Sequence, residues 1–409
     1  MNHPVSSSMT SVDSHLAEVL AAIQPLTPVM LGLAEAEGGV LAEDITATTP
    51  LPSFDNSAMD GYAVQARDLD RATEAAPVTL PVTGEIPAGD TGSHQVTPGR
   101  CVRIMTGALL PPGADAVVPV EWTDGGTARA AFRQPVAPGN AIRRRGDDVA
   151  KGDLLLAAGA FLGSVQVALL AAAGTGSALV RPRPRVAVIS TGNELAEPGS
   201  PIIPGQIWDS NSFMLAAAAR QAGAVAHRHR ITDDTAGVLI AIEDQLPHAD
   251  LLITSGGVSM GGEHDVVKAA LADLGTVTFR KVAMQPGMPQ GFGVVGPQRT
   301  PIFTLPGNPV SAYVSFELFV RPALRALQGL PTARISPARA VLTDAVRSPQ
   351  GRRSFLRGVH DAEEGTVTPL TGQASHQLGA LALANVLIIV PEQVVSMDAG
   401  DPVDLMRLP

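Results

Sequence analysis

The fold of this chain is decided around residues 255–265, which read SGGVSMGGEHD and directly follow the apolar run 249–254, ADLLIT. The run predicts a buried strand, and small residues between a strand and a helix present backbone N–H groups to an anion. Ser255 and Ser259 add hydroxyls, and Asp265 adds a carboxylate, so a phosphate beside Mg²⁺ is the predicted ligand. Four glycines allow the close approach: Gly256, Gly257, Gly261 and Gly262. For this loop alone, an ordinary Gly-rich turn remains the alternative.

Two further strands are predicted to end in similar loops. Residues 185–190, RVAVIS, lead into Thr191-Gly192-Asn193-Glu194, and residues 301–305 lead into Pro306-Gly307-Asn308-Pro309. Asn308 suits an N-cap and Pro309 a first helical position, which predicts a helix running to about Leu327. Because loops at the carboxyl ends of strands in a doubly wound sheet share one crevice, the three loops are predicted to form one ligand site.

Five motifs occur in one order along the chain. They are FDNSAMDGYAV at 54–64, IMTGA at 104–108, TGNEL at 191–195, SGGVSMGGEHD at 255–265 and LPGNPVSAY at 305–313. Together they resemble the molybdopterin molybdenumtransferases, the family of MoeA and the gephyrin E domain, from about Ala17 to Leu408. The resemblance implies a MogA-like doubly wound α/β sheet domain, a β insertion domain, a split N-terminal domain and a C-terminal β-barrel-like domain.

Domain boundaries are expected at the proline-rich stretches 50–52 and 181–184. We expect a split N-terminal linker and dimerisation domain at 14–50 and 147–181, with helices at 15–23 and 32–41. A β insertion domain is expected at 51–146, the molybdopterin-binding α/β domain, with a parallel sheet, at 182–330, and a C-terminal β domain at 331–409. Residues 154–180 carry no charge, but their glycines and polar residues predict a strand, a short helix at 163–173 and another strand rather than a membrane span.

The resemblance also assigns the site. It implies catalytic roles for Asp60, Thr106, Asp148, Glu194 and Asp265. The first three lie in the β insertion, Asp148 at its C-terminal border, and would face the sheet domain of the other subunit of a homodimer. Taken singly, Asp60 and Asp148 also suit turn or capping carboxylates. The loops and the resemblance together predict substrate contacts from Thr191, Gly192, Ser255, Gly256, Gly257, Ser259, Gly261, Pro289, Gly307, Asn308, Ser311 and Arg357.

The reaction implied by the resemblance is insertion of molybdate into adenylylated molybdopterin, with release of AMP. Glu194 and Asp265 would hold Mg²⁺, which offsets charge on the phosphoanhydride, and the carboxylates would position the metal and move protons. No protein nucleophile is required. A molybdopterin adenylyltransferase is the partner that the family implies, and the residues leave molybdate and tungstate open.

One loop departs from the family pattern. Residues 283–289 read AMQPGMP, so Gln285 and Met288 stand where the family typically has the two lysines of Lys-Pro-Gly-Lys-Pro, associated with molybdate. Gly379 and Ala380 likewise replace serines. Losing two charge-assisted contacts, each worth roughly 1.5 to 3 kcal/mol, predicts weakened molybdate binding. The alternative function is a gephyrin-like dimeric scaffold that binds a partner peptide from a receptor or a cytoskeletal or cell-division protein.

Composition excludes several other classes. A net charge of −10 and few large polar aromatic residues argue against nucleic-acid binding. The single Cys101 excludes an internal disulfide and a Cys-based zinc site. Arginines at 143–145 and at 181, 183 and 185 are candidates for a local anion-binding charge or for a solvated face. The N terminus has no secretory signal pattern, which predicts a cytoplasmic protein.

Overall fold

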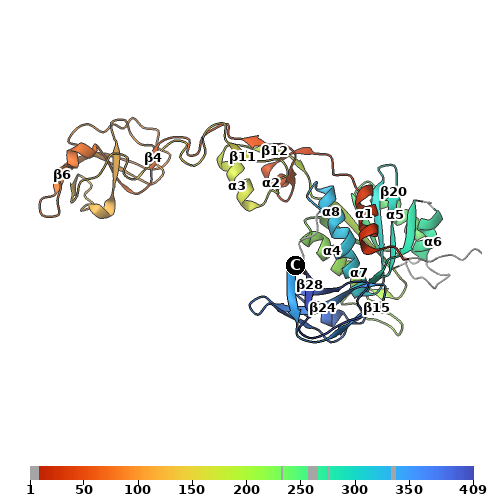
Figure 1. Ribbon diagram of the computed structural model, residues 1–409. Coiled ribbons are helices and arrows are strands. Elements are labelled where there is room, and N and C mark those ends of the chain that lie inside the picture. Colours follow the sequence, from red (N-terminus) through yellow and green to blue (C-terminus); the bar gives the residue numbers. More distant parts are fainter. Residues whose placement is uncertain (1–8, 232–233, 257–265, 274–275, 333–337) are drawn as a thin grey trace, which may run out of the picture. The chain divides into compact units, whose positions relative to one another are not determined.

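The computed structural model describes residues 9–231, 234–256, 266–273, 276–332 and 338–409. The chain forms two compact units. The sheet unit comprises Met1–Val29, Gly38–Val40 and Val180–Pro409, and the insertion unit comprises Met30–Glu37 and Leu41–Leu179. Figure 1 labels their main elements. In the described ranges, no helix is long and apolar enough to cross a membrane.

The sheet unit is built on a six-stranded sheet in the order β16-β13-β17-β21-β20-β18. The bounds are β13 Arg185–Thr191, β16 Val225–Ile231, β17 Leu251–Ser255, β18 Val277–Lys281, β20 Pro289–Val295 and β21 Thr300–Leu305. The first four strands in this order are parallel, which confirms the three predicted strands. The predicted parallel sheet is confirmed for these four strands, whereas β20 pairs antiparallel with both β21 and β18. The short link between β20 and β21 permits only a hairpin, since a parallel crossover needs a dozen or more residues.

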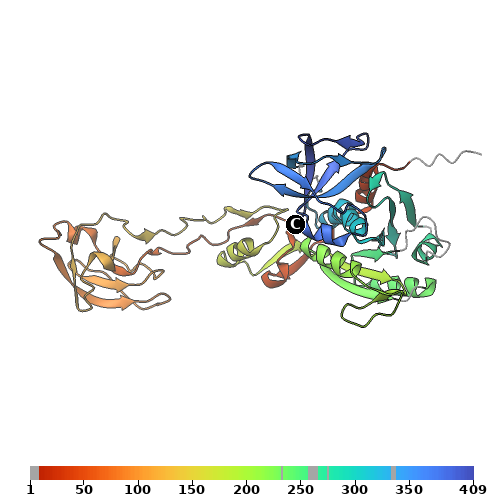
Figure 2. The same cartoon turned by 90° about the horizontal axis from the view of Figure 1, so that it is seen from below.

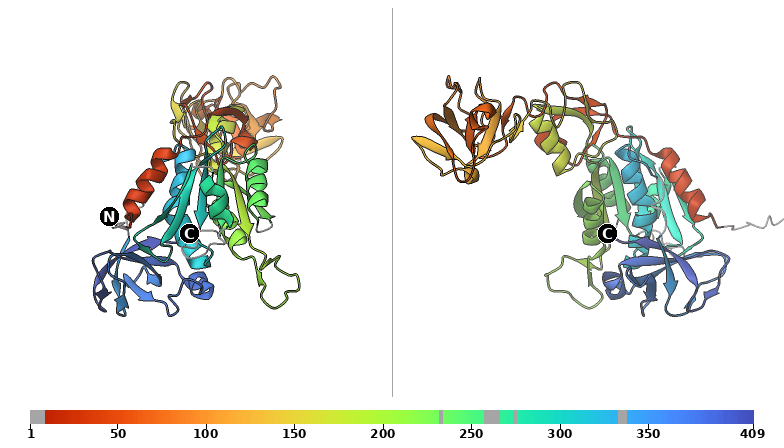
Figure 3. Two further views of the ribbon diagram at one scale, coloured as in Figure 1. Left: turned by 90° about the vertical axis from the view of Figure 1, so that its right-hand side faces the viewer. Right: turned by 60° about the vertical axis from the view of Figure 1, so that its left-hand side comes forward.

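Helices cover both faces of this sheet (Figure 3). On one face lie α1 Val12–Ala22, α4 Asn211–Gln221 and a continuous helical segment of α7 Pro309–Ser315, a π-helical turn Phe316–Val320 and α8 Arg321–Leu327. On the other lie α5 Thr235–Gln245 and α6 Val266–Asp273. Alternate residues of β13 serve the two cores: Val186 and Val188 face one, and Ala187 and Ile189 the other. The apolar runs therefore reflect strands buried on both sides. The predicted helix to Leu327 is confirmed.

The C-terminal part of the sheet unit is a closed barrel, drawn in blue in Figure 2. Its strands are β22 Ala338–Leu342, β24 Arg353–Asp361, β25 Thr366–Pro369, β26 Val386–Val390 and β28 Pro402–Arg407. Closure results because β24 pairs with both β25 and β26. The short strand β19, Met284–Gln285, adds to β24 in parallel and so carries a loop of the α/β domain to the barrel. Smaller elements are β14 Leu195–Ala196, β15 Ile207–Trp208, β23 Val346–Arg347, β27 Ser396–Met397 and α9 Leu378–Leu383.

The insertion unit contains short strands, two short helices and a β domain. The strand, helix and strand predicted within 154–180 are confirmed as β11 Leu154–Leu156, α3 Ser164–Ala172 and β12 Ser177–Arg181. The helix predicted at 32–41 was too long. It is limited to α2, Leu33–Ala36, because Gly38 adopts a φ of 77° and β2, Val40–Leu41, follows. The remaining short strands here are β1 Val29–Gly32 and β3 Ile45–Thr46.

The β domain of the insertion unit has a five-stranded sheet in the order β8-β5-β7-β6-β9. The bounds are β5 Gly61–Val64, β6 Val78–Ile86, β7 Cys101–Ile104, β8 Ala116–Pro119 and β9 Arg129–Phe132, with 3₁₀ turns at Ala66–Leu69 and Val120–Trp122. Tyr62 and Phe132 pack edge to face in its core, their ring centroids 5.6 Å apart. A ribbon of β4 Asn56–Ser57 and β10 Ile142–Arg143 leads into it.

Candidate functional site

The carboxyl ends of three neighbouring parallel strands meet, as their loops predict. In β17 and β21, Ser255 pairs with Leu305, and the Gly256 N–H donates to the Leu305 carbonyl at 3.0 Å. A Cβ on Gly256 would lie 3.9 Å from the Thr191 carbonyl oxygen, and a Cβ on Gly307 would lie 3.8 Å from the Gly256 Cα. The predicted residues Thr191, Gly256 and Gly307 are thus brought together at one edge of the sheet.

Asn211, which the sequence reasoning missed, joins two of these loops. Its Nδ2 donates to the Ser255 hydroxyl at 2.9 Å and to the Gly307 carbonyl at 2.7 Å. Its Oδ1 is buried and has no hydrogen-bond partner among the described residues. A buried acceptor without a partner is uncommon in proteins and fits a ligand that donates to it.

Asp209 anchors the start of α4, the helix that begins at Asn211, and the sequence reasoning missed this residue as well. Its buried carboxylate accepts from the Ser190 hydroxyl at 2.7 Å, the Ser212 hydroxyl at 2.6 Å and the Ser212 N–H at 3.0 Å. The end of β13 is therefore tied to the first turn of α4. The available signal was local: residues 209–212 read DSNS, a run of helix-capping residue types directly after β15.

Glu194 offers a free carboxylate beside this edge. The side chain is exposed, and among the described residues it has no hydrogen-bond or ion-pair partner, whereas the Glu194 backbone carbonyl accepts from the Ile207 N–H at 2.8 Å. A Cβ on Gly192, whose φ is 150°, would lie 2.5 Å from Glu194 Oε2, so the carboxylate folds back over a residue that must be glycine. Five residues predicted in the 255–265 loop lie outside the described residues: Gly257, Ser259, Gly261, Gly262 and Asp265. Within the described ranges, no three His, Cys, Asp or Glu side chains are grouped to hold a metal ion.

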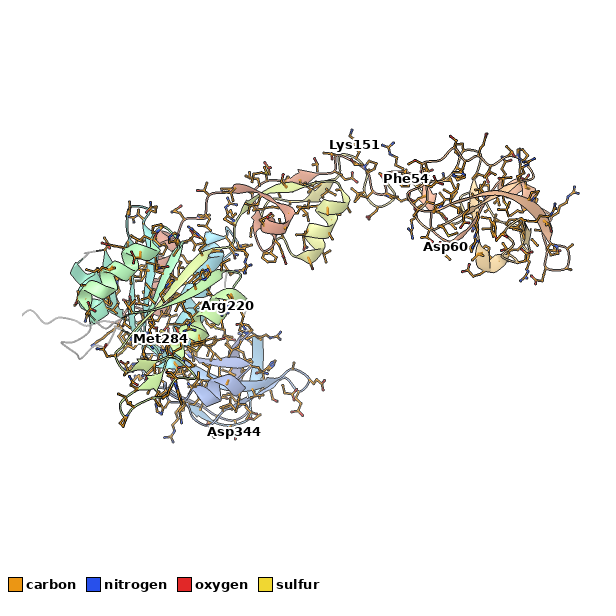
Figure 4. The ribbon with its side chains drawn as sticks, turned by 180° about the vertical axis from the view of Figure 1, so that it is seen from behind. Phe54, Asp60, Lys151, Arg220, Met284 and Asp344 are labelled. Atoms are coloured by element: carbon orange, nitrogen blue, oxygen red, sulfur yellow. The ribbon has the colours of Figure 1, made fainter. Side chains whose placement is uncertain are left out.

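Asp60 and Thr106 form a pair in the insertion unit, where Figure 4 labels Asp60. Asp60 Oδ1 accepts from the Thr106 N–H and from the Thr106 hydroxyl, each at 2.7 Å. These bonds, the backbone one first, lower the pKa of Asp60 below its usual value. Thr106 thus fixes the orientation of the exposed Asp60 carboxylate and favours its ionised form, so two predicted catalytic residues act as a pair.

Asp148 does not join this pair. Its N–H donates to the Leu51 carbonyl at 3.0 Å, and the next residue, Val149, forms a bridge with Leu51. This is one end of the two-stranded ribbon. The Ser57–Ile142 pair forms the other end, which is the one nearer Asp60. Between these ends, Asp55 accepts from the Arg145 N–H at 2.8 Å and from Arg144 Nη1 at 2.7 Å. Arg144 therefore holds the ribbon together.

Two arginines of the second run, Arg183 and Arg185, are also structural. Arg183 donates from Nε to the Gly223 carbonyl and from Nη2 to the Ala224 carbonyl, both at 3.1 Å. Arg185 forms a bidentate ion pair with Asp250, with Nη2 2.8 Å from Oδ1. Neither side chain points its charge at the three strand ends.

A cavity of about 200 Å³ lies in the sheet unit, beside the loop that carries Gln285 and Met288. Figure 4 labels Met284 in this loop. Gln290 is buried, and its Nε2 donates to the Gly287 carbonyl and the Ser315 hydroxyl, both at 2.6 Å, which holds the loop against α7. The cavity is lined by Met284, Gln285, Pro286, Gly287, Met288, Ser311, Arg352, Gln373, Ala374 and Ser375.

Arg357 lies directly behind one wall of this cavity. Its side chain is fully buried, and Nη2 donates to the carbonyls of Gly372 and Ala374. Among the residues that the structure describes, Nε and Nη1 have no partner, and burial lowers the pKa of the guanidinium. A buried cation with unpaired donors is costly unless an acceptor satisfies it. The site is therefore suited to an anion.

Three family models match almost the whole chain in order. They are described as the MoeA N-terminal region (domain I and II), matching residues 10–174, a probable molybdopterin binding domain, matching 187–326, and the MoeA C-terminal region (domain IV), matching 339–408. Molybdopterin molybdenumtransferase 2 of Mycobacterium tuberculosis is 49% identical over 98% of this chain and 100% of its own length. The chain belongs to the molybdopterin molybdenumtransferase family.

Other relatives support the same assignment. The molybdopterin molybdenumtransferase of Haemophilus influenzae is 36% identical over 97% of this chain and 98% of its own length. Among solved structures, a molybdopterin biosynthesis MoeA protein from Pyrococcus horikoshii has a TM-score of 0.74 and 33% identity, covering 98% of this chain and 99% of that one. This confirms that the molybdenumtransferase fold, with the sheet domain, β insertion, split N-terminal domain and C-terminal barrel, is shared.

Proposed function

We propose that this molybdenumtransferase inserts molybdate into adenylylated molybdopterin and releases AMP, using the three strand ends for the phosphates and the cavity for molybdate. One observation carries the proposal. Gly307 belongs to the strand-end edge and Ser311 lines the cavity, and the two residues lie on either side of the start of α7, Gly307 just before the N-cap Asn308 and Ser311 in the first turn. Phosphate and oxyanion would therefore lie next to each other, as a reaction between them requires.

Each group has a role in this reaction. The backbone N–H of Gly307 would bind the phosphates, and the carboxamide of Asn211, through its bonds to Ser255 and Gly307, would hold the loops in the orientation that binding needs. Glu194 has a free carboxylate, which fits Mg²⁺, since this ion is usually held by one or two carboxylates together with substrate phosphates. Asp265 would be the second ligand. Bound there, Mg²⁺ would offset the charge that develops on the phosphoanhydride oxygens.

We also propose that the active enzyme is a homodimer whose sites combine the two units of different copies. Asp60 and Thr106 of one copy would act on substrate held by the sheet unit of the other. The resemblance assigns Asp148 to the same site, although its N–H is bonded to Leu51, away from the Asp60–Thr106 pair. Exposed apolar side chains surround both surfaces: Phe54, Met59 and Leu109 lie near Asp60, and Ile203, Ile207 and Trp208 follow Glu194. Exposed apolar groups around polar residues are typical of surfaces that bind a partner.

We propose four domains. The split N-terminal domain at 14–50 and 147–181 would mediate dimerisation, and it would be accompanied by the β insertion at 51–146, the α/β domain at 182–330 and the C-terminal β domain at 331–409. A cytoplasmic location and a molybdopterin adenylyltransferase as partner are likewise expected, since the relatives are biosynthetic enzymes. No feature of the described residues favours a gephyrin-like scaffold over the transferase.

The decisive test is molybdate-dependent release of AMP from adenylylated molybdopterin by the full-length protein with Mg²⁺. We expect turnover by the wild type and complementation of a strain that lacks this transferase, scored by molybdoenzyme activity. Folded protein with neither property would contradict the proposal. Binding of a receptor or cytoskeletal peptide by such an inactive protein would instead support the scaffold.

A further inference from the structure

Arg352 is the charged residue among those that line the cavity, and sequence reasoning did not identify it. Its Nη1 lies 3.5 Å from Gln285 Oε1, a long and weak hydrogen bond. Its backbone carbonyl accepts from the Ser348 hydroxyl at 3.4 Å. Among the described residues, no carboxylate forms an ion pair with its guanidinium. The cation therefore faces the cavity with most of its donors available.

The neighbouring arginine shows the contrast. Arg353 Nη2 lies 2.9 Å from Asp13 Oδ2 and 2.8 Å from Glu392 Oε1, so its charge is neutralised within the protein. Asp13 and Glu392 are thus already engaged by Arg353. A half-buried arginine without such a partner, at the mouth of a cavity, is suited to an external anion.

We propose that Arg352 binds the oxyanion directly and takes over the role of the two missing loop lysines. This inference rests on the proposed function and concerns the same cavity. The planar guanidinium can donate two parallel hydrogen bonds to two oxygens of a tetrahedral dianion, which a lysine ammonium cannot. Because the Gln285 carbonyl oxygen faces Arg352, its amide nitrogen is left to donate to the anion.

The remaining walls supply weaker neutral contacts. Ser311 and Ser375 offer hydroxyls, while Met284 and Met288 offer thioethers, which are poor acceptors and carry no charge. Arg357 lies behind the wall and does not line the cavity, so molybdate binding would depend on the half-buried positive charge of Arg352. Affinity should therefore fall steeply when that charge is removed.

The experiment is calorimetric binding of sodium molybdate to the full-length protein, with parallel kinetics of AMP release at varied molybdate. The variants are Arg352→Gln, Arg352→Lys and the control Arg347→Gln, an exposed arginine of β23 in the same C-terminal part of the chain that does not line the cavity. We expect Arg352→Gln to weaken molybdate binding by about 10- to 100-fold and to raise KM for molybdate, with kcat retained at saturation. Arg352→Lys should recover only part of the affinity, and Arg347→Gln should match the wild type.

A double variant distinguishes the loss of the Arg352 charge from misfolding of Arg352→Gln. Adding Gln285→Lys to Arg352→Gln places a cation beside the position that the guanidinium has lost and should restore part of the affinity. Wild-type affinity and KM in Arg352→Gln would overturn the inference, as would a wild type that binds no molybdate. If molybdate binding requires Arg352 but the wild type releases no AMP, the proposed function fails and the anion site stands.

Discussion

The carboxamide of Asn211 donates to the hydroxyl of Ser255 at 2.9 Å, which joins the first residue of α4 to the last residue of β17. A second bond from the same nitrogen reaches the Gly307 carbonyl. One side chain at the start of a helix thereby sets the spacing of two substrate loops. Because the contacts bind and orient rather than react, the loss of Asn211 should impair turnover through geometry.

Asn211→Ala is expected to lower kcat/KM for adenylylated molybdopterin by about 10- to 100-fold, since it removes two hydrogen bonds that hold the phosphate loops. Steady-state AMP release measures this. Ser210→Ala is the matched control, because Ser210 is the N-cap of the same helix and makes no side-chain cap hydrogen bond. Equal rates for Asn211→Ala and the wild type would show that the loops keep their spacing without it.

Mixed dimers test the shared site. Asp60→Ala and Glu194→Ala chains, each inactive alone, should regain part of their activity after subunit exchange, because heterodimers would contain one site with both lesions and one with neither. Mass spectrometry confirms the exchange, and each variant mixed with itself is the control. If exchanged heterodimers stay inactive, each site is built within a single chain.

Restoring the family lysines should strengthen molybdate binding unequally. Met288→Lys adds a cation to the cavity, whereas Gln285→Lys places an ammonium beside the Arg352 guanidinium, which now lies 3.5 Å from Gln285 Oε1. Each new contact with the dianion is worth roughly 1.5 kcal/mol, so Met288→Lys should tighten binding about tenfold. Repulsion should reduce the gain from Gln285→Lys, and the double variant should stay below a hundredfold. Calorimetry at matched ionic strength measures these effects, with AMP binding as the control that should not change.

His15 should make the sheet unit less stable in mild acid. Burial against Phe319, with ring centroids 4.7 Å apart, lowers the pKa of His15 from 6.5 to about 4. Between these values the unfolded chain binds the proton and the folded chain does not, so stability falls as the pH falls. The free energy of unfolding should drop by about 2 kcal/mol from pH 7 to pH 5 through this residue.

Urea denaturation at both pH values measures this drop. A Trp122→Phe background leaves Trp208 as the fluorescent reporter of the sheet unit. In His15→Phe the part of the pH dependence due to His15 should vanish. An unchanged slope between pH 7 and pH 5 in His15→Phe would assign it to other groups.

The strands and loops of the sheet unit were predictable because their signals are local. Buried apolar runs at 185–190 and 301–305 became β13 and β21, and Pro309 begins the helix that was expected there. The helix at 32–41 was overestimated because apolar periodicity does not show that Gly38 turns the chain with a positive φ.

By itself, therefore, the sequence determined where the elements lie and which loops follow the strands, because apolar runs, small residues and caps act on their near neighbours. Only the tertiary structure decided which distant side chains meet. Arg352 is 67 residues from Gln285 and reaches it because β19 pairs with β24. Asn211 is 96 residues from Gly307 and reaches it because β13, β17 and β21 are adjacent. Strand order and register set such contacts, and both depend on the packing of the whole sheet.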